Sequence, residues 1–248
     1  MDFKFSEEQE KLRQEVRDFL EEELRQGSFE PSCDSWIQGY SPEFTRKVAQ
    51  KGWIGLTWPK EYGGQERSHV DRLIVTEEML RYGAPAACHW FADRQIGNSI
   101  LRYGTEEQKK EFLPKIIRGE AYIGLGMSEP EAGSDLASLQ TRAVKDGDVY
   151  IVDGQKTWTS CGKFMNYIYL VARTDPMVPK HRGISEFIVD VSLPGITINP
   201  IIDITGSEAW ANVFFDGVRV PRKCLIGEEN HGFYQILNQI DYERGGLE

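Results

Sequence analysis

Apolar residues recur at helical spacing through roughly the first 120 residues of the chain. The first helix is expected to begin at Ser6, because Ser6-Glu7-Glu8-Gln9 has the form of a capping box and apolar residues follow at helical intervals. Further helices are predicted over about 41–52, 70–83, 90–103 and 105–119. The helix at Ser41 begins with a serine N-cap and a proline at N1, and a second capping box starts at Thr105. Residues 1–120 are therefore expected to form an all-α domain.

From about residue 121 the pattern changes to short apolar runs rich in β-branched and aromatic residues. Strands are predicted over 122–127, 140–144, 149–152, 156–160, 167–173, 184–191, 196–200 and 210–215. Asp-Gly or Pro-Gly pairs at 146–147, 153–154, 194–195 and 216–217 predict turns between them. Because no long helix separates the strands, a parallel βαβ sheet is disfavoured, and an antiparallel barrel is expected over residues 121–230.

The pattern becomes helical again from Gly232, where Phe233, Ile236 and Ile240 fit one broad apolar face. Such a helix needs a partner surface to bury that face. Residues 231–248 are therefore expected to begin a C-terminal helical bundle that is completed by more chain or by another polypeptide. The predicted fold class is α+β: a helical domain, an antiparallel β-barrel domain, and the start of a helical bundle.

Composition narrows the function classes. With 40% hydrophobic and 27% charged residues the chain is typical of a globular protein, and no apolar run reaches the roughly 18 residues of a membrane span. A net charge of −10 disfavours nucleic acid as a partner. The four cysteines form no C-x-x-C pair and the histidines have no metal-ligand spacing, so free thiols and no metal site are expected. Without a recognisable leader, a cytoplasmic location is expected.

The segment Gly124–Asp135 places glycines, hydroxyls and carboxylates between two apolar runs. Its Gly-x-Gly is not a dinucleotide-binding loop, because no third glycine opens a helix and no βαβ unit follows. Two interpretations remain. One is an ordinary glycine-rich turn, and the other is a strand-end loop whose amides and hydroxyls, including Ser128 and Ser134, face a bound ring or its ribityl chain.

A second segment, Trp158-Thr159-Ser160, lies near the end of a predicted strand. Strand alternation places Trp158 and Ser160 on the same face, where the indole could cover an aromatic ring and the hydroxyl could donate a hydrogen bond to it. Taken alone, Trp158 would be interpreted as a core residue of a barrel. Together with the loop at Gly124–Asp135, it favours a site for a flat, redox-active ring.

These two segments resemble the flavin-binding signature of the acyl-CoA dehydrogenases, and the resemblance covers essentially all 248 residues. Several motifs occur in the order typical of that family. They are Tyr103-Gly104-Thr105-Glu106-Glu107-Gln108, Ser128-Glu129-Pro130 with Ala132-Gly133-Ser134-Asp135, Asp153-Gly154-Gln155-Lys156, and Phe215-Asp216-Gly217-Val218-Arg219-Val220-Pro221.

The resemblance implies FAD as the cofactor. The residues that would line it are Leu125, Gly126, Met127, Ser128, Gly133, Ser134, Trp158, Thr159 and Ser160. Met127 and Ser128 would lie beside the isoalloxazine ring, and Ser160 near its N5. The family often has threonine at the position of Ser160, which keeps the donor, and usually has asparagine at the position of Cys161. Cys161 is therefore either a reactive thiol or a small packing residue.

The segment Asp241-Tyr242-Glu243-Arg244 would, by pattern alone, be a helix surface with a solvated charge pair. In the family this part of the helix borders the acyl-CoA site. Most members carry their catalytic glutamate further downstream, whereas those similar to isovaleryl- and long-chain acyl-CoA dehydrogenases carry it here. The resemblance thus implies Glu243 as the base, with Ser134, Asp241, Tyr242 and Arg244 on the substrate side. A downstream base remains the alternative.

The activity implied by the resemblance is FAD-dependent α,β-dehydrogenation of an acyl-CoA to a trans-2-enoyl-CoA, as in the β-oxidation of lipids. A carboxylate would remove the α-proton while the β-hydrogen leaves as hydride. Electrons would pass to an electron-transfer flavoprotein, and the protein would be a homo- or hetero-oligomer, a dimer or tetramer. Two alternatives stay open: a non-catalytic subunit of a hetero-oligomeric acyl-CoA dehydrogenase, and a relative acting as an oxidase or monooxygenase.

Overall fold

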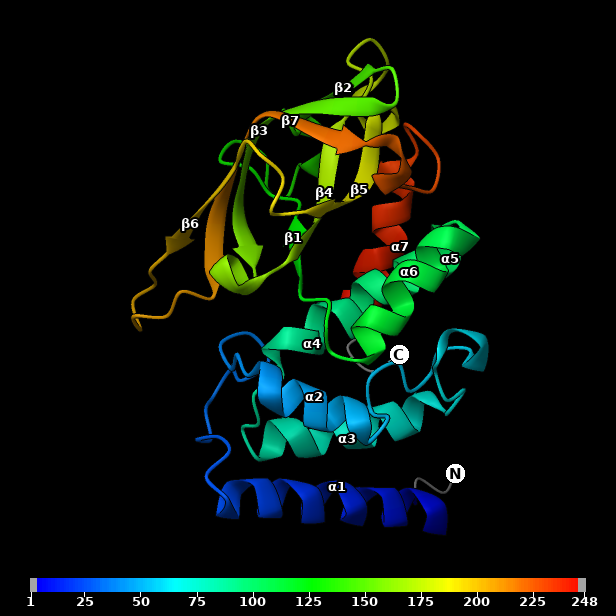
Figure 1. Ribbon diagram of the computed structural model, residues 1–248, viewed down its shortest axis with the longest axis vertical. Helices are drawn as coiled ribbons and strands as arrows, with labels where there is room; N and C mark the ends of the chain where they lie inside the picture. Colours follow the sequence, from blue (N-terminus) through cyan, green and yellow to red (C-terminus); the bar gives the residue numbers. More distant parts are fainter. Residues whose placement is uncertain (1–3, 245–248) are drawn as a thin grey trace.

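The computed structural model describes residues 4–244, except the side chains of Lys163 and of residues 242–244. Helices gather at one end of the long axis and the sheet at the other (Figure 1). The α-helices are α1 (Glu7–Arg25), α2 (Pro42–Gln50), α3 (His69–Arg81), α4 (Ala87–Phe91), α5 (Gly97–Tyr103), α6 (Glu106–Ile117) and α7 (Gly232–Arg244). Within the described residues, no helix combines the length and apolar content needed to cross a membrane.

The expected helix starts are confirmed where a cap was identified. Ser6 and Thr105 each form a complete capping box, and the Ser41 side chain accepts a hydrogen bond from the backbone N–H of Phe44. The helix expected over 90–103 begins earlier, with α4, and it is not uniform. A π-helical segment, η2 (Ala92–Ile96), joins α4 to α5. Such π turns occur frequently at functional sites.

The strands are β1 (Ile123–Gly126), β2 (Arg142–Asp146), β3 (Val149–Ser160), β4 (Tyr167–Arg173), β5 (Ile184–Asp190), β6 (Ile196–Ile201), β7 (Trp210–Pro221) and β8 (Leu225–Ile226). They form one sheet in the order β6-β7-β3-β2-β4-β5-β8, with β1 beside β4. Most neighbours are antiparallel, but β1 and β2 each pair with β4 in parallel. The α+β class is confirmed, and the sheet is mixed rather than purely antiparallel.

Two of the expected turns are wrong. Asp153-Gly154 lies within β3 and Asp216-Gly217 within β7, and the register between the two strands shifts at this point. The Asp153 side chain accepts a hydrogen bond from the backbone N–H of Gly217 at 2.9 Å, which joins the two irregular segments. Both strands continue beyond the bulge, so the runs at 149–152 and 156–160 form one strand. The pairs at 146–147 and 194–195 do connect strands.

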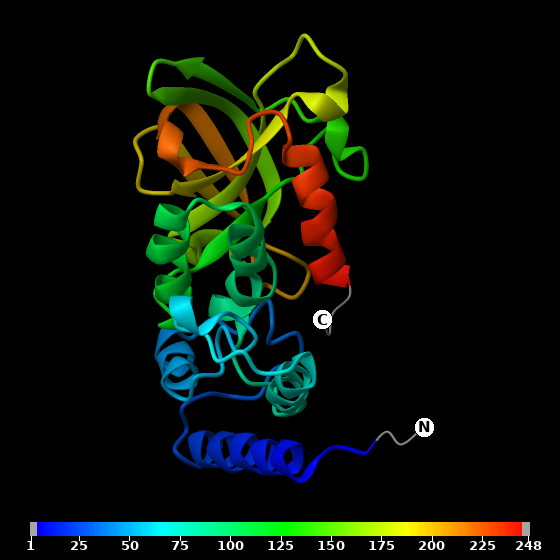
Figure 2. The ribbon, with the colours of Figure 1, turned by 90° about the vertical axis from the view of Figure 1, so that its right-hand side faces the viewer.

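Helix α7 leads from the sheet back toward the helical end, as Figure 2 shows in red. It packs against η2, α5 and β5. Gln235, Ile236 and Gln239 lie on its buried face, while Tyr234 and Leu237 are about half exposed. This helix therefore brings residues of the last part of the chain against both the helical domain and the sheet.

Candidate functional site

A buried ion pair fixes the loop that follows β1. The Lys156 ammonium lies 2.7 Å from Glu129 Oε1 and donates a hydrogen bond to the carbonyl of Met127 at 3.0 Å. Glu129 also accepts from the backbone N–H groups of Gln140 and Thr141, at 2.6 and 2.9 Å. One carboxylate thus ties the beginning of the loop to its end, and both to β3.

The electrostatics of this pair favour the charged form of both partners at neutral pH. Burial lowers the pKa of Lys156 to about 8, against the attraction of Glu129. Burial opposes the ionisation of Glu129, but Lys156 and the donors around the carboxylate bring its pKa below the ordinary value. The sequence analysis did not recognise this pair. The only available signal was that each residue lies inside a family motif.

A second bulge lies near the end of β3, at Trp158. The register with β7 shifts between Lys156 and Thr159, and Trp158 has φ 57°, a region that bulky residues seldom adopt. Its indole is 58% exposed and meets Trp210 edge to face at 6.3 Å. The core interpretation of Trp158 is therefore wrong. An exposed indole on a strained backbone is available to cover a planar ligand.

The loop after β1 and the end of β3 lie side by side. The backbone N–H of Thr157 donates to the carbonyl of Ser128 at 2.9 Å. At Gly124 a Cβ would stand 2.6 Å from the carbonyl of Ser160, so the two strands approach as closely as glycine permits. The structure therefore brings the expected residues 125–128 next to 158–160. Gly133 and Ser134 lie further along the loop and are exposed.

Cys161 is the first residue after β3. Its φ of 66° is a conformation that suits asparagine better than most residues. Its thiol is 6% exposed and donates to the carbonyl of Ala87 at 3.6 Å. Burial raises the pKa of the thiol to about 12, which removes the thiolate that reactivity requires. Cys161 is thus a packing residue. It and the other three cysteines are free, as expected.

The loop also contacts α7. Met127 and Leu136 pack with Phe233, Ile236 and Ile240 in one apolar cluster. The backbone of α7 is described through residue 244, but the side chains expected at Tyr242, Glu243 and Arg244 lie outside the described residues.

Helical geometry nevertheless fixes the face on which the expected base falls. Position 243 is three residues beyond Ile240 and seven beyond Ile236, so it falls on the same face of α7. Asp241, which was also expected on the substrate side, is exposed on the opposite face.

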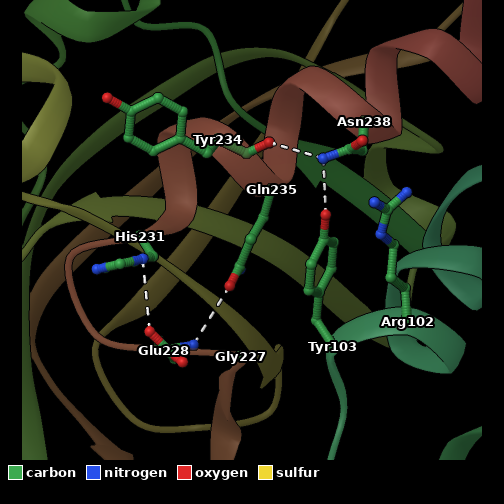
Figure 3. Close-up of a pocket in the computed structure, with 8 residues that line it drawn as sticks. All are labelled: Arg102, Tyr103, Gly227, Glu228, His231, Tyr234, Gln235 and Asn238. Atoms are coloured by element: carbon green, nitrogen blue, oxygen red, sulfur yellow. Dashed lines mark hydrogen bonds and ion pairs between the residues drawn. The ribbon is translucent and has the colours of Figure 1, made fainter.

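A cavity of about 460 Å³ lies beside another face of α7 (Figure 3). Its lining comes from the end of α5, the β8–α7 loop and α7: Arg102, Tyr103, Gly227, Glu228, His231, Tyr234, Gln235 and Asn238. Asn238 donates to the Tyr103 hydroxyl at 2.7 Å across the cavity. None of the cofactor, substrate or catalytic residues expected from the sequence lines it, so it is separate from the candidate site.

A short basic segment lies between the loop and α7. Lys180 pairs with Asp135 at 2.7 Å, and the His181 ring meets those of Phe233 and Tyr234 edge to face. Arg182 completes this segment, η5 (Lys180–Arg182). The sequence analysis missed it, although three consecutive basic residues in a chain of net charge −10 were a usable signal.

The fold joins a helical domain to a mixed sheet, and the candidate site lies where the loop after β1, the end of β3 and α7 approach one another. Residues 6–120 match the acyl-CoA dehydrogenase N-terminal domain, and residues 124–218 match the acyl-CoA dehydrogenase middle domain. The chain belongs to the acyl-CoA dehydrogenase family.

Among curated relatives, acyl-CoA dehydrogenase FadE26 of Mycobacterium tuberculosis is 39% identical over 254 residues, covering 100% of this chain and 63% of the relative. The mitochondrial isovaleryl-CoA dehydrogenase of Pongo abelii is 36% identical, covering 96% and 57%.

Solved structures of similar proteins share this fold. The Tcur3481-Tcur3483 steroid ACAD superposes with a TM-score of 0.88 at 37% identity, covering 99% of this chain and 64% of that one. The ChsE4-ChsE5 complex of Mycobacterium tuberculosis gives 0.85 at 38%, covering 98% and 61%. The chain spans less than two thirds of the length of these relatives.

Proposed function

We propose that this chain provides the flavin site and the catalytic base of an FAD-dependent acyl-CoA dehydrogenase that forms trans-2-enoyl-CoA. The observation that carries the proposal is a convergence of three segments. The loop at Met127 and Ser128 is hydrogen-bonded to β3 next to the exposed indole of Trp158, and it packs on the α7 face on which position 243 falls. Family membership supports the same activity.

The residues at this site fit FAD. Trp158 offers an uncovered aromatic face, and the buried Thr159 hydroxyl has no hydrogen-bond partner among the described residues. When bound, FAD would supply the acceptor for a hydride. The chain would hold the cofactor, with Trp158 covering the ring system and with Ser128, Ser160 and the loop amides as donors to its edge.

Glu243 is the proposed base. Its carboxylate would take the proton from the carbon next to the thioester carbonyl. The electrons of that C–H bond form the new double bond, and the β-hydrogen leaves with its electron pair. Met127, Ile236 and Ile240 form an apolar wall beside this position, which would keep water away from the reacting carbons.

The CoA portion would pass Ser134 and the basic segment. Lys180, His181 and Arg182 form one turn next to the first turn of α7. The cationic side chains of Lys180 and Arg182, beside a helix N-terminus, suit the phosphates of CoA. Tyr242, Arg244 and Asp241 remain proposed substrate contacts on the same helix. We also propose an electron-transfer flavoprotein as acceptor, an oligomeric assembly and a cytoplasmic location.

The substitution Glu243→Gln tests the assignment of the base. It keeps shape and removes the proton acceptor, so the variant should retain its flavin and lose turnover by a factor of about a thousand. Steady-state turnover with a panel of acyl-CoA thioesters and the flavin absorbance measure the two effects. Glu228→Gln, which changes an exposed carboxylate in the loop between β8 and α7, should leave turnover unchanged. Turnover retained in Glu243→Gln would move the base to another residue.

A non-catalytic subunit in a hetero-oligomer is the second candidate. The observation in its favour is that one similar solved structure is the ChsE4-ChsE5 complex of Mycobacterium tuberculosis. In that case the isolated assembly would carry flavin, but Glu243→Gln would not change its turnover. Rapid reaction of the reduced flavin with oxygen would instead support an oxidase or monooxygenase.

A further inference from the structure

Two buried glutamine side chains, one on α7 and one on η2, have amide atoms without a hydrogen-bond partner among the described residues. Gln239 on α7 is 1% exposed, and neither its Oε1 nor its Nε2 has a hydrogen-bond partner among the described residues. Gln95 on η2 is 3% exposed, and its Oε1 also has none. Each buried polar group without a hydrogen-bond partner destabilises the fold. The stability of the ligand-free fold therefore does not account for these two amides.

The neighbouring side-chain amides on α7 do have hydrogen-bond partners, so the lack of partners is confined to Gln239 among the described residues of this helix. Gln235 donates to Glu186 at 2.6 Å and accepts from the backbone N–H of Glu228 at 3.2 Å. Figure 3 shows Gln235 and Asn238 engaged in this way on the cavity side of the helix. Gln239 lies one turn beyond Gln235, where the described side chains offer it nothing.

The location links these amides to the proposed active site. Position 243 is one turn beyond Gln239 on the same face of α7. Helix η2, which carries Gln95, packs against α7 and also contacts β1, whose last residues lead into the loop at Met127. The contact between η2 and α7, the two helices that carry Gln95 and Gln239, is therefore next to the carbons that would react.

We propose that Gln239 and Gln95 bind a hydroxyl group in the acyl portion of the substrate, an inference that rests on the proposed function. The unpartnered set contains a donor, Gln239 Nε2, and two acceptors, Gln239 Oε1 and Gln95 Oε1. A hydroxyl both accepts and donates, so it satisfies one group of each kind. A plain alkyl chain would leave all three desolvated and unpaired, and sites of this type reject such analogues.

Matched pairs of acyl-CoA thioesters test the proposal. Each pair has one chain length, with and without a hydroxyl, and the hydroxyl position is varied along the series. Calorimetry on the flavin-loaded protein, in the assembly in which it is isolated, gives the Kd of each. At one position the hydroxyl should tighten binding about tenfold or more, and Gln239→Leu should abolish that gain. Equal binding of every pair, or a preference that persists in Gln239→Leu, overturns the proposal.

The thermal stability of the ligand-free protein gives a second readout. Gln239→Leu keeps the side-chain size and removes two unpaired polar atoms, so its Tm should rise. A fall in Tm without a change in hydroxyl preference would mean that Gln239 is only structural. Asn238→Leu is the matched control, because Asn238 is paired with Tyr103: it should lower Tm and keep the preference. If Gln239→Leu does not fold, Gln95→Leu replaces it in the test of hydroxyl preference.

Flavin absorbance recorded with the same thioesters distinguishes failure of the hydroxyl site from failure of the proposed dehydrogenase activity. Flavin bleaching by several thioesters, with no hydroxyl preference, rejects the hydroxyl site and keeps the dehydrogenase. No bleaching by any thioester rejects the dehydrogenase itself.

Discussion

Lys156 and Glu129 are the residues on which the cofactor loop depends most. Both side chains are almost completely buried, and each supplies hydrogen bonds to the backbone of the loop in addition to the ion pair. A buried pair adds little to stability relative to an apolar pair, but loss of one partner leaves the other charge uncompensated. The loop is therefore held in place by an interaction that tolerates no single replacement.

We expect Lys156→Met to lower the free energy of unfolding by about 3–5 kcal/mol, because it leaves Glu129 buried without its partner. The variant should also bind flavin more weakly, because Met127 and Ser128 lose their support. Urea denaturation and flavin content measure both effects. Lys180→Met, which breaks an exposed pair with Asp135 in the same loop, should change stability by less than about 1 kcal/mol. Equal effects of the two substitutions would contradict this account.

At this scale the sequence identifies residue types better than their roles. The two motifs lie on segments that are neighbours in the structure, but Trp158 taken alone was interpreted as a core residue. The left-handed bulge that exposes the indole depends on pairing with β7, more than 50 residues away. The burial of Lys156 could not be predicted from the sequence either. Lysine is almost never fully buried without a charged partner, and the partner, Glu129, is distant in the sequence.

Helix α7 is the element that joins the two halves of the site, and it is anchored to β5 through Glu186. Glu186 is fully buried and accepts from Gln235 at 2.6 Å. Burial raises its pKa from 4.5 to about 8, although Gln235 and Tyr169 favour the ionised form. Glu186 is therefore protonated at neutral pH, and α7 is docked on a neutral carboxyl group.

This docking predicts a pH dependence. Between pH 4.5 and about 8 the native state keeps a proton that the unfolded state has released, so the free energy of unfolding falls as pH rises through this range. Glu186→Gln mimics the protonated form and should remove that loss. It should match the wild type at pH 4.5 and exceed it by a few kcal/mol at pH 8, in urea denaturation. An unchanged pH profile would show that Glu186 does not titrate in this way.

Elements specified by local interactions were predicted well, and those specified by distant pairing were not. Capping boxes at Ser6 and Thr105 involve residues three positions apart, so the sequence contains the whole interaction. The Asp-Gly pairs at 153–154 and 216–217 look like turns locally, but each strand continues because the other strand accommodates the bulge. The π turn at η2 has no comparable local signature.

For the whole molecule, the site exists only because three distant segments converge. The loop after β1, the bulge of β3 and the buried face of α7 are separated by tens of residues and meet where the helical domain contacts the sheet (Figures 1 and 2). The resemblance to the family anticipated the fold class and these segments. The basic turn at Lys180 had a usable signal in three consecutive basic residues, whereas the unpaired amides on η2 and α7 are recognisable only in the assembled molecule.

The most direct test of this convergence is a calorimetric titration of the flavin-free protein, in its isolated assembly, with FAD. We expect binding by the wild type and about tenfold weaker binding by Trp158→Gly, because the indole is proposed to cover the ring system. Glycine accepts φ 57°, so the stability of the ligand-free variant should be equal or higher. Failure of the wild type to bind FAD, or unchanged affinity in Trp158→Gly, would contradict the account.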